Sequence, residues 1–316
     1  MKIYTDLNQF RVQRPVVTIG TFDGIHRGHQ KVIARLNDFA RHHNGESVIF
    51  TFHTHPRLVT SPEETSLRLL TTLEEKTVLL ERAGIDHLII YPFNREFANL
   101  TYSEFVEKIL VEKLRTHCLV VGYDHKFGKN REGGFDYLQK CAEKYNFHIE
   151  KLDALLVEDD SVSSTKIRNA LECGDIEKAN QFLGYPFTLH GTVVTGKQLG
   201  RKLGFPTANI ESSNKYKIIP GYGVYAVKVK LKQGEYNGML NIGTRPTFNN
   251  NADNRSIEVN IFDFDDDIYG QEITLEFVGK IRDEQKFSDM HQLAAQLATD
   301  RQTAHSIISK QKLFFD

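Results

Sequence analysis

The chain has 316 residues, a length that suggests two domains at roughly 150 residues each. Its 40 Lys and Arg residues and 41 Asp and Glu residues leave a net charge of −1, which argues against a duplex-DNA reader with a strongly basic face. Hydrophobic residues make up 40% and charged residues 26%, an ordinary globular usage that excludes a wholly disordered chain.

The first 185 residues alternate short apolar runs with amphipathic stretches. Buried strands are predicted at 16–20, 47–52, 87–91 and 118–123, because these runs are short and rich in β-branched residues. Helical patterns lie between and after them, at about 29–43, 73–83, 102–115 and 132–146. This alternation predicts a doubly wound α/β domain over residues 1–185, with ligands bound beyond the carboxyl ends of its strands.

After residue 185 the apolar period changes to two. In the segment 225–231, apolar side chains share one face and lysines the other, and the same alternation returns at 257–261 and 273–277. Such strands predict a small antiparallel barrel or sandwich over residues 186–316. A closing helix is expected from a Ser288 N-cap to near Lys310.

The loop after the first strand, GTFDGIHRGHQKVI at 20–33, is typical of a phosphate-binding turn. Glycines at 20, 24 and 28 allow close backbone approach, and a helix is expected to begin near Gly28 or His29, where free N–H groups favour an anion. His26 and His29 flank Gly28 and can donate hydrogen bonds to phosphate oxygens. A lone loop histidine usually binds nothing, but an HxGH pair after a buried strand favours phosphate.

A second cluster, VSSTKIRNAL at 162–171, places hydroxyls and cations together at a predicted helix start. Capping explains one hydroxyl among Ser163, Ser164 and Thr165, and not three of them combined with Lys166 and Arg168. Binding of a polyphosphate is the better account of the whole cluster.

The stretch GKQLGRKLGFPTANI at 196–210 combines glycines and cations in what we predict to be a flexible basic flap. Pro206 then restricts the backbone before Thr207 and Asn209, which point to the same side if the chain is extended. Their oxygens are hard ligands suited to Mg²⁺. The alternative is a surface turn with ordinary polar residues.

No apolar run approaches the roughly 18 residues of a membrane span, and the first residues lack the apolar core of a signal peptide. The cysteines at 118, 141 and 173 lie far apart without CxxC spacing. We therefore expect a cytoplasmic protein with reduced thiols and no membrane or nucleic-acid partner.

The first half resembles the HxGH nucleotidylyltransferase superfamily. It is most similar there to the adenylyltransferase half of the bacterial bifunctional riboflavin kinase/FMN adenylyltransferases, also called FAD synthetases. The resemblance rests on GTFDGIHRGH, TFHTHP (51–56), FNREFANL (93–100), VVGYDHKFGKNREGG (120–134) and VSSTKIR. It departs at His125-Lys126, where the family commonly has Phe-Arg.

This resemblance implies a Rossmann-like domain that transfers AMP from ATP to the phosphate of FMN, releasing pyrophosphate and forming FAD. It implies catalytic roles for His26 and His29. Further ATP contacts are implied for Gly20, Phe22, Gly24, Gly28, Asp124, Ser164, Thr165 and Arg168. The flavin-side candidates are Phe52, His55 and Asn94.

The second half resembles the riboflavin kinase domain of the same family in PTAN, GVYAV (223–227), MLNIGTRPTF (239–248) and IEVNIFDFDDDIYGQEI (257–273). This implies a β-barrel with a C-terminal helix that transfers the γ-phosphoryl group of ATP to riboflavin, with Glu258 as general base and Mg²⁺ on Thr207 and Asn209. Arg282 is the implied flavin-side residue. ATP contacts are implied for Gly196, Lys197, Gly200, Arg201 and Gly204.

Three other interpretations stay open: a chain with one live activity, a non-catalytic flavin-binding protein, and an adenylyltransferase for another phosphorylated acceptor. The presence of both motif sets in order disfavours all three. Riboflavin, FMN and ATP are therefore the expected small-molecule partners, with FMN and FAD as products. A carboxylate on a strand is usually a solvated face residue, so the role of Glu258 depends on the resemblance and not on the strand pattern.

Overall fold

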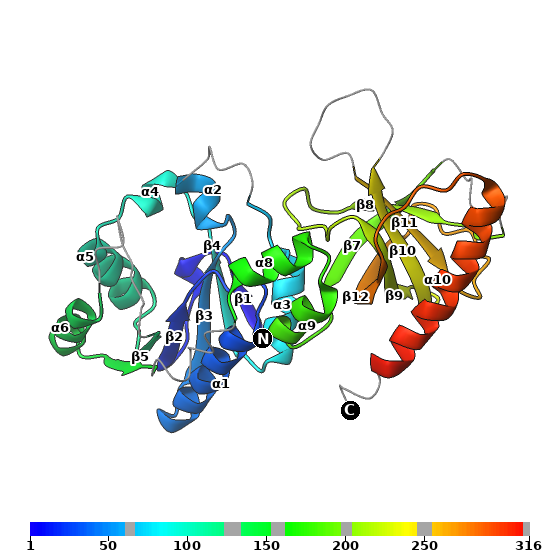
Figure 1. The fold of residues 1–316 in the computed structure, drawn as a ribbon. Coiled ribbons are helices and arrows are strands. Elements are labelled where there is room, and N and C mark those ends of the chain that lie inside the picture. Colours follow the sequence, from blue (N-terminus) through cyan, green and yellow to red (C-terminus); the bar gives the residue numbers. More distant parts are fainter. Residues whose placement is uncertain (61–66, 123–133, 153–161, 197–203, 245–254, 312–316) are drawn as a thin grey trace. The chain divides into compact units, whose positions relative to one another are not determined.

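The computed structural model describes residues 1–60, 67–122, 134–152, 162–196, 204–244 and 255–311 (Figure 1). The chain divides into two compact units, Met1–Ser164 and Thr165–Asp316. The functional boundary expected after residue 185 stays a prediction.

The first unit contains a parallel sheet of six strands in the order β1-β4-β3-β2-β5-β6. Its strands are β1 (Lys2–Tyr4), β2 (Pro15–Ile19), β3 (Glu46–Phe52), β4 (His87–Tyr91), β5 (Cys118–Val121) and β6 (His148–Lys151). The four predicted strands are confirmed. The sequence analysis missed β1 and β6, two edge strands of three and four residues without an apolar run.

Alternate residues of each strand point to opposite faces of the sheet, and both faces are apolar here. Helices pack on both faces and bury these side chains. On one side Val16 and Ile49 pack with residues of α1 (Arg27–His42) and α3 (Leu73–Arg82). On the other, Val17 and Phe50 pack with a π-helix (Phe105–Lys113) and α6 (Phe135–Tyr145). Short helices complete the unit: α2 (Pro56–Thr60), α4 (Arg95–Ala98) and α5 (Tyr102–Glu104).

The single helix predicted over 102–115 is wrong in detail. The Thr101–Glu104 capping box starts one α-helical turn, α5, after which the backbone widens into the π-helix. The buried residues of that π-helix, Phe105, Val106, Ile109 and Leu110, recur every four positions. This spacing is close to the period of an α-helix, so the apolar pattern does not distinguish the two helix types.

The chain order of the sheet places a binding crevice at the end of β2. The chain builds β3 and then β4 on one side of β2, and later returns to place β5 on its other side. The reversal makes the carboxyl end of β2 a topological switch point, where open α/β sheets bind ligands. The loop with His26 and His29 follows that end directly.

The second unit is built on a closed antiparallel barrel in the order β10-β11-β8-β7-β12-β9. Its strands are β7 (Thr188–Val194), β8 (Ala208–Ser212), β9 (Gly223–Leu231), β10 (Gly234–Thr244), β11 (Arg255–Ile261) and β12 (Glu272–Arg282). The predicted alternation is confirmed, because Tyr225, Val227 and Val229 are fully buried whereas Lys228 is partly exposed. Helices α8 (Ser164–Glu172) and α9 (Ile176–Leu183) precede the barrel in the chain.

A long helix, α10 (Met290–Gln311), packs along the outside of β9, β10 and β12 (Figure 1). Ala304 and Ile308 on this helix contact a cluster that includes Ala226 and Met239. The expected cap is wrong by one residue: the Asp289 carboxylate, not Ser288, accepts the N–H of Gln292 at 2.9 Å.

A buried ion pair fastens α10 to the barrel. The Arg282 guanidinium donates from Nε to both carboxylate oxygens of Asp300 at 3.0 Å, and its Nη2 lies 2.8 Å from Oδ2. Asp300 is only 1% exposed, so its charge depends on this partner and on Gln296 Nε2 at 2.9 Å. Arg282, the flavin-side candidate, thus has a structural contact that its sequence position did not indicate.

We expect Arg282→Met to lower the free energy of unfolding by about 3–5 kcal/mol, because it leaves a buried carboxylate without its cation. Urea denaturation followed by circular dichroism measures this change. Arg301→Met is the matched control, since Arg301 pairs at 2.7 Å with Asp263, whose side chain is 81% exposed. That pair should contribute no more than about 1 kcal/mol. Equal losses in both variants would contradict the prediction.

Candidate active sites in the two domains

The loop after β2 makes a tight turn that ends in a helix N-terminus. Phe22, Gly24 and Ile25 all have positive φ values, 46°, 89° and 35°. Helix α1 begins at Arg27, slightly earlier than predicted, with His26 as its N-cap. His26 Nδ1 accepts the N–H of His29 at 3.4 Å. A neutral imidazole that accepts at Nδ1 carries its proton on Nε2, so His26 is arranged to donate from that atom.

The two histidines of the motif lie against each other. Their rings stack with centroids 3.8 Å apart and an interplanar angle of 18°, and the Phe22 ring lies 5.1 Å from His29. Gly28 makes this possible, because a Cβ there would lie 3.2 Å from both Cε1 and Nδ1 of the His26 ring. The glycine of HxGH therefore lets His26 fold onto the helix end.

The surroundings of His29 keep its ring neutral. Burial, with smaller effects from His26 and Lys76, holds the pKa of His29 well below its ordinary value of 6.5. His29 is partly exposed as a residue, but its Nδ1 is enclosed and has no hydrogen-bond partner among the described residues. At neutral pH His29 therefore offers a hydrogen bond and not a full charge.

The lowered pKa of His29 predicts a pH-dependent stability. The unfolded chain takes up this proton as pH falls through 6.5, whereas the folded chain resists it, so stability falls with pH in the window below 6.5. The contribution is at most about 1.4 kcal/mol per pH unit. Urea midpoints measured at about pH 7.5 and 5.5 should fall more for the wild type than for His29→Gln. The same pH dependence in both proteins would contradict this.

Two residues that the sequence analysis did not select, Asp23 and Thr71, fasten this loop to the segment before α3. The buried Asp23 carboxylate accepts the N–H groups of Leu70 at 3.0 Å and Thr71 at 3.1 Å. Thr71 Oγ1 in turn accepts the N–H of Gly24 at 3.0 Å. An aspartate inside the glycine-rich turn, between Gly20 and Gly24, is the sequence signal that could have identified Asp23.

Lys76 is a third functional candidate that sequence reasoning missed. It comes from α3 and is 8% exposed, and its Nζ donates to the Thr21 carbonyl at 2.6 Å. Burial lowers the pKa of Lys76, while Asp23 acts in the opposite direction. The sequence signal that could have identified Lys76 is its position on the apolar face of the predicted helix, between Leu73 and Leu80. A lysine there brings positive charge toward the HxGH loop.

A pocket joins these groups to the predicted flavin side. Its lining includes Asp23, Thr71 and Lys76 together with Phe52 and His55. Phe52 and His55 follow from the end of β3, the neighbour of β2 in the sheet. The structure therefore brings two of the three flavin-side candidates to the same pocket as the HxGH loop.

The other contacts of the flavin-side candidates are local. The Phe52 ring lies 5.1 Å from Phe93 and 5.7 Å from Phe97, so aromatic packing also accounts for it. His55 Nδ1 accepts a backbone N–H from Arg57 at 3.3 Å. Asn94 is exposed and caps α4, its Oδ1 accepting the N–H of Phe97 at 2.8 Å.

The serine-rich cluster reaches the HxGH loop through Ser164. Its Oγ donates to the Asp23 carbonyl at 3.0 Å, at the first residue of α8. Thr165 and Arg168 follow on the same helix, the first exposed and the second partly exposed. Gly20 lies at the end of β2, where its N–H donates to the Phe50 carbonyl at 3.1 Å. Asp124 and the His125-Lys126 departure lie outside the described residues.

In the barrel, the predicted metal ligands and the predicted base come together. Asn209 on β8 lies directly opposite Glu258 on β11, and Thr207 Oγ1 donates to Glu258 Oε2 at 3.5 Å. Gly196 lies against Asn209, since a Cβ at this glycine would be 1.9 Å from the Asn209 amide nitrogen. A side chain at residue 196 would therefore displace the Asn209 amide group from this position.

Glu258 is more exposed than its neighbours on both sides of the strand. Ile257 and Val259 are 3% and 0% exposed, whereas Glu258 is partly exposed. Asn260, which the sequence analysis did not select, shares its side of β11 and donates to the Pro206 carbonyl at 2.7 Å. That bond holds the start of the PTAN segment next to Glu258. The sequence signal that could have identified Asn260 is its position two residues after Glu258, which places both side chains on one side of the strand.

The remaining kinase-side candidates are less informative. Gly204 is exposed with a φ of 77°, a left-handed conformation that suits glycine. Lys197, Gly200 and Arg201 lie outside the described residues. Within the described part of the chain, no helix is both long and apolar enough to cross a membrane.

Comparison with known proteins identifies both halves. The family model for FAD synthetase matches residues 9–166, and that for riboflavin kinase matches residues 183–308. A crystal structure from Streptococcus pneumoniae, described as a macrolide-efflux protein, superposes with a TM-score of 0.85 at 31% identity. It covers 96% of this chain and 98% of that one.

Curated relatives match along nearly the whole chain. The bifunctional riboflavin kinase/FMN adenylyltransferase of Haemophilus influenzae is 39% identical over 94% of this chain and 96% of its own. The enzyme of the same description from Escherichia coli K12 is 37% identical over 97% of each chain. The chain belongs to the family of bifunctional riboflavin kinase/FMN adenylyltransferases, with the adenylyltransferase half first and the riboflavin kinase half second.

Proposed function

We propose that the HxGH loop and the start of α8 bind ATP for adenylyl transfer to FMN. The FMN phosphate attacks the α-phosphorus of ATP, and the bond to pyrophosphate breaks, so no covalent enzyme intermediate is needed. Catalysis then consists of alignment and stabilisation of negative charge on phosphate oxygens. The observation that supports this most is the His26 ring, which caps α1 through Nδ1 and so carries its proton, when neutral, on Nε2.

The roles of the other groups follow from their chemistry. His29, neutral and stacked on His26, is a second donor to phosphate, and the free N–H groups of the α1 start add to both. We assign Ser164, Thr165 and Arg168 to the phosphates that leave as pyrophosphate. Lys76 supplies positive charge to the pocket from below the loop. Asp124 stays a nucleotide-side prediction, together with Gly20, Phe22 and Gly24 as backbone that approaches the ligand.

The pocket next to the HxGH loop is the proposed flavin side. Phe52 and His55 line it. Asn94 stays a flavin-side prediction, for which only its side-chain NH₂ group is available because its Oδ1 caps α4. An apolar ring and two polar groups suit an isoalloxazine, which has a flat apolar face and hydrogen-bonding edges. Arg282 remains the flavin-side candidate of the barrel.

We propose that the barrel phosphorylates riboflavin through Glu258. The Glu258 carboxylate accepts the proton of the ribityl 5′-hydroxyl as that oxygen attacks the γ-phosphorus of ATP, and ADP leaves. Thr207 and Asn209, which converge next to Glu258, have the oxygen donors that Mg²⁺ prefers. When bound, the ion neutralises charge on the ATP phosphates. The predicted basic flap at 196–204 stays a prediction, because residues 197–203 lie outside the described part of the chain; its first residue, Gly196, lies close to Asn209.

The test of the whole proposal is incubation of the full chain with riboflavin, ATP and Mg²⁺, followed by separation of the flavins. We expect FMN first and FAD later, and neither product when EDTA removes Mg²⁺. FMN alone would contradict the adenylyltransferase assignment. Failure to phosphorylate riboflavin while added FMN is still converted to FAD would contradict the kinase assignment.

The Mg²⁺ ligands are tested separately. We expect Asn209→Ala to raise the Mg²⁺ concentration that half-saturates riboflavin phosphorylation by at least about tenfold, because an oxygen ligand is lost. Asn237→Ala is the control, since Asn237 lies on β10 opposite Lys228, away from Glu258. An unchanged Mg²⁺ requirement in Asn209→Ala would exclude this residue as a ligand.

The cytoplasm is the compartment that we propose. Supporting it, Cys118, Cys141 and Cys173 are all unpaired, and burial raises the pKa of the Cys118 thiol to about 12. Unpaired thiols suit a reducing compartment.

A further inference from the structure

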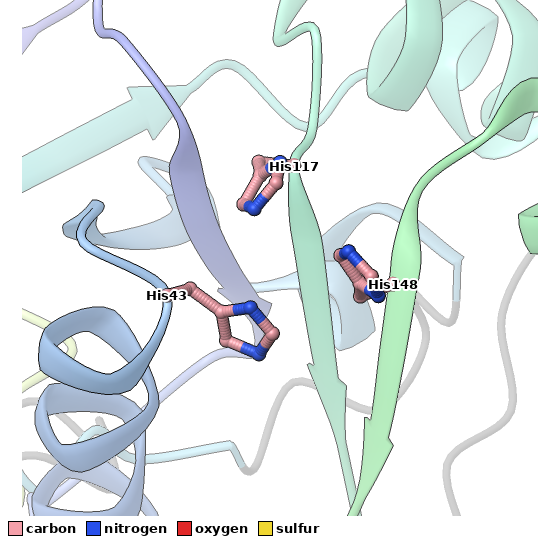
Figure 2. A group of neighbouring side chains, drawn as sticks. All are labelled: His43, His117 and His148. Carbon is pink, nitrogen blue, oxygen red and sulfur yellow. The ribbon is translucent and has the colours of Figure 1, made fainter.

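Three histidines from separate parts of the first unit meet away from the HxGH loop (Figure 2). His43 follows α1, His117 precedes β5, and His148 is the first residue of β6. Each offers a ring nitrogen, and these three nitrogen atoms all lie within 4.8 Å of one another. Figure 2 shows the three rings facing a common space between the end of α1 and the two strands.

Backbone hydrogen bonds hold the three positions in place. The His43 N–H closes the end of α1 by donating to the Phe39 carbonyl at 2.9 Å. The His117 N–H donates to the Pro15 carbonyl at 3.0 Å, and the His148 N–H donates to the His117 carbonyl at 2.8 Å. The ring centroids are 5.1–5.6 Å apart as a result. These bonds fix the backbone positions from which the three side chains extend.

A carboxylate adjoins the cluster at His43, and one ring nitrogen of the cluster is unsatisfied. Glu150 stands two residues after His148 on β6, and its Oε1 lies 3.7 Å from His43 Nε2. That Nε2 atom is enclosed and makes no hydrogen bond within the described residues. A buried nitrogen of this kind normally finds a partner. A cation shared with the other two rings would provide one.

The geometry is close to that of a tetrahedral zinc-type site. With metal–nitrogen bonds of about 2.0–2.1 Å, the ligand nitrogens of such a site lie roughly 3.3–3.4 Å apart. The present separation of 4.8 Å or less therefore needs a contraction of about 1.5 Å at most, which side-chain rotation can supply. Three imidazoles are also donors that borderline transition metals accept more readily than Mg²⁺ or Ca²⁺ does.

One nearby group opposes a cation. The Arg14 guanidinium lies 3.1 Å from His117 Nε2, so its positive charge stands next to one of the three rings and occupies one of the two nitrogens through which His117 could bind an ion. Arg14 is exposed, so its side chain can leave this position at little cost. Competition of this kind predicts that removing Arg14 tightens binding, which a merely adventitious gathering of histidines does not.

We propose that His43, His117 and His148, with Glu150, form a binding site for a divalent transition-metal ion of the zinc class. The site lies at the amino ends of β5 and β6, whereas the HxGH loop follows the carboxyl end of β2 in the same parallel sheet. It is therefore distinct from the adenylyltransferase site and from the Mg²⁺ site proposed in the barrel. Its effect is to tie the end of α1 to two strands, which stabilises the first unit.

Titration of the full chain with Co²⁺, after EDTA treatment and without nucleotide, tests the site. The visible absorption of Co²⁺ reports coordination by nitrogen, and competition with Zn²⁺ gives the affinity of both ions. We expect His148→Gln to weaken the tightest site at least about tenfold, because a ligand is lost. His148 is exposed, so this variant should fold. His42→Gln is the matched control, being an exposed histidine next to the cluster and outside it.

Two further measurements complete the test. Arg14→Asn should bind Co²⁺ more tightly than the wild type, and asparagine suits the positive φ of 53° at this position. Zn²⁺ should raise the unfolding midpoint of the wild type and of His42→Gln, and raise it less in His148→Gln. Equal Co²⁺ affinity and equal stabilisation in the wild type and His148→Gln would overturn the proposal.

Discussion

Glu258→Ala should abolish riboflavin phosphorylation while FMN adenylylation continues at close to the wild-type rate. Loss of a general base costs typically 10²–10⁴-fold in rate. The expected loss lies toward the upper part of that range, because Glu258 is also the group to which Thr207 donates, at 3.5 Å. The measurement is the initial rate of FMN formation from riboflavin, and separately of FAD formation from added FMN.

A matched control distinguishes catalysis from damage to the barrel. Glu235→Ala removes a carboxylate from β10, whose side chain is 69% exposed and pairs with Lys230. This residue lies at the turn between β9 and β10, far along β10 from Asn241, the residue opposite Glu258. Both rates should stay within about twofold of the wild type. Equal loss of both activities in Glu258→Ala would contradict the assignment of the two reactions to two halves.

His29→Ala should have the opposite effect, a loss of FAD formation with riboflavin phosphorylation preserved. Removing one donor to a developing oxyanion costs about 10²–10³-fold in rate. The loss extends beyond His29 itself, because the ring stacks on His26 at 3.8 Å and contacts Phe22 at 5.1 Å. Without it, the His26 ring loses the contact that helps to hold its donor in place.

The measurement is single-turnover conversion of FMN to FAD at saturating ATP. His42→Ala is the control, since this residue is exposed in the last turn of the same helix. An unchanged rate of FAD formation in His29→Ala would remove the HxGH role. A parallel fall in riboflavin phosphorylation would instead indicate a general loss of folding.

The two halves differ in how their sites depend on neighbouring elements. The adenylyltransferase loop is held by buried polar contacts, in which Asp23 receives N–H groups from Leu70 and Thr71. The kinase site is held by strand pairing, which sets Asn209 opposite Glu258. A change that destabilises the segment before α3 should therefore affect FAD formation, and a change in β8 or β11 should affect FMN formation.

Local sequence determined the classes of element and the motifs. Short β-branched runs predicted the four central strands, because buried parallel strands must be apolar on both faces, and the period of two predicted the strands of the barrel. The HxGH and PTAN segments could be identified for the same reason: each is a short stretch whose chemistry depends on residues adjacent in the chain. The apolar pattern did not predict the edge strands β1 and β6, since an edge strand needs no continuous apolar run.

Tertiary structure decided what depends on groups distant in the chain. The sequence predicted Lys76 only as part of an amphipathic helix, whereas in the structure its Nζ lies 2.6 Å from the Thr21 carbonyl. Arg282 was a flavin candidate by position, yet its guanidinium is held by Asp300 from α10. His43, His117 and His148 carry no spacing signal, because the pairing of β5 with β6 and the position of the α1 end, and not sequence proximity, bring them within 4.8 Å. The pattern of residues indicates the apolar periodicity of each element and the positions where the backbone requires glycine or proline. Contacts between side chains distant in the chain form only when the sheet has formed.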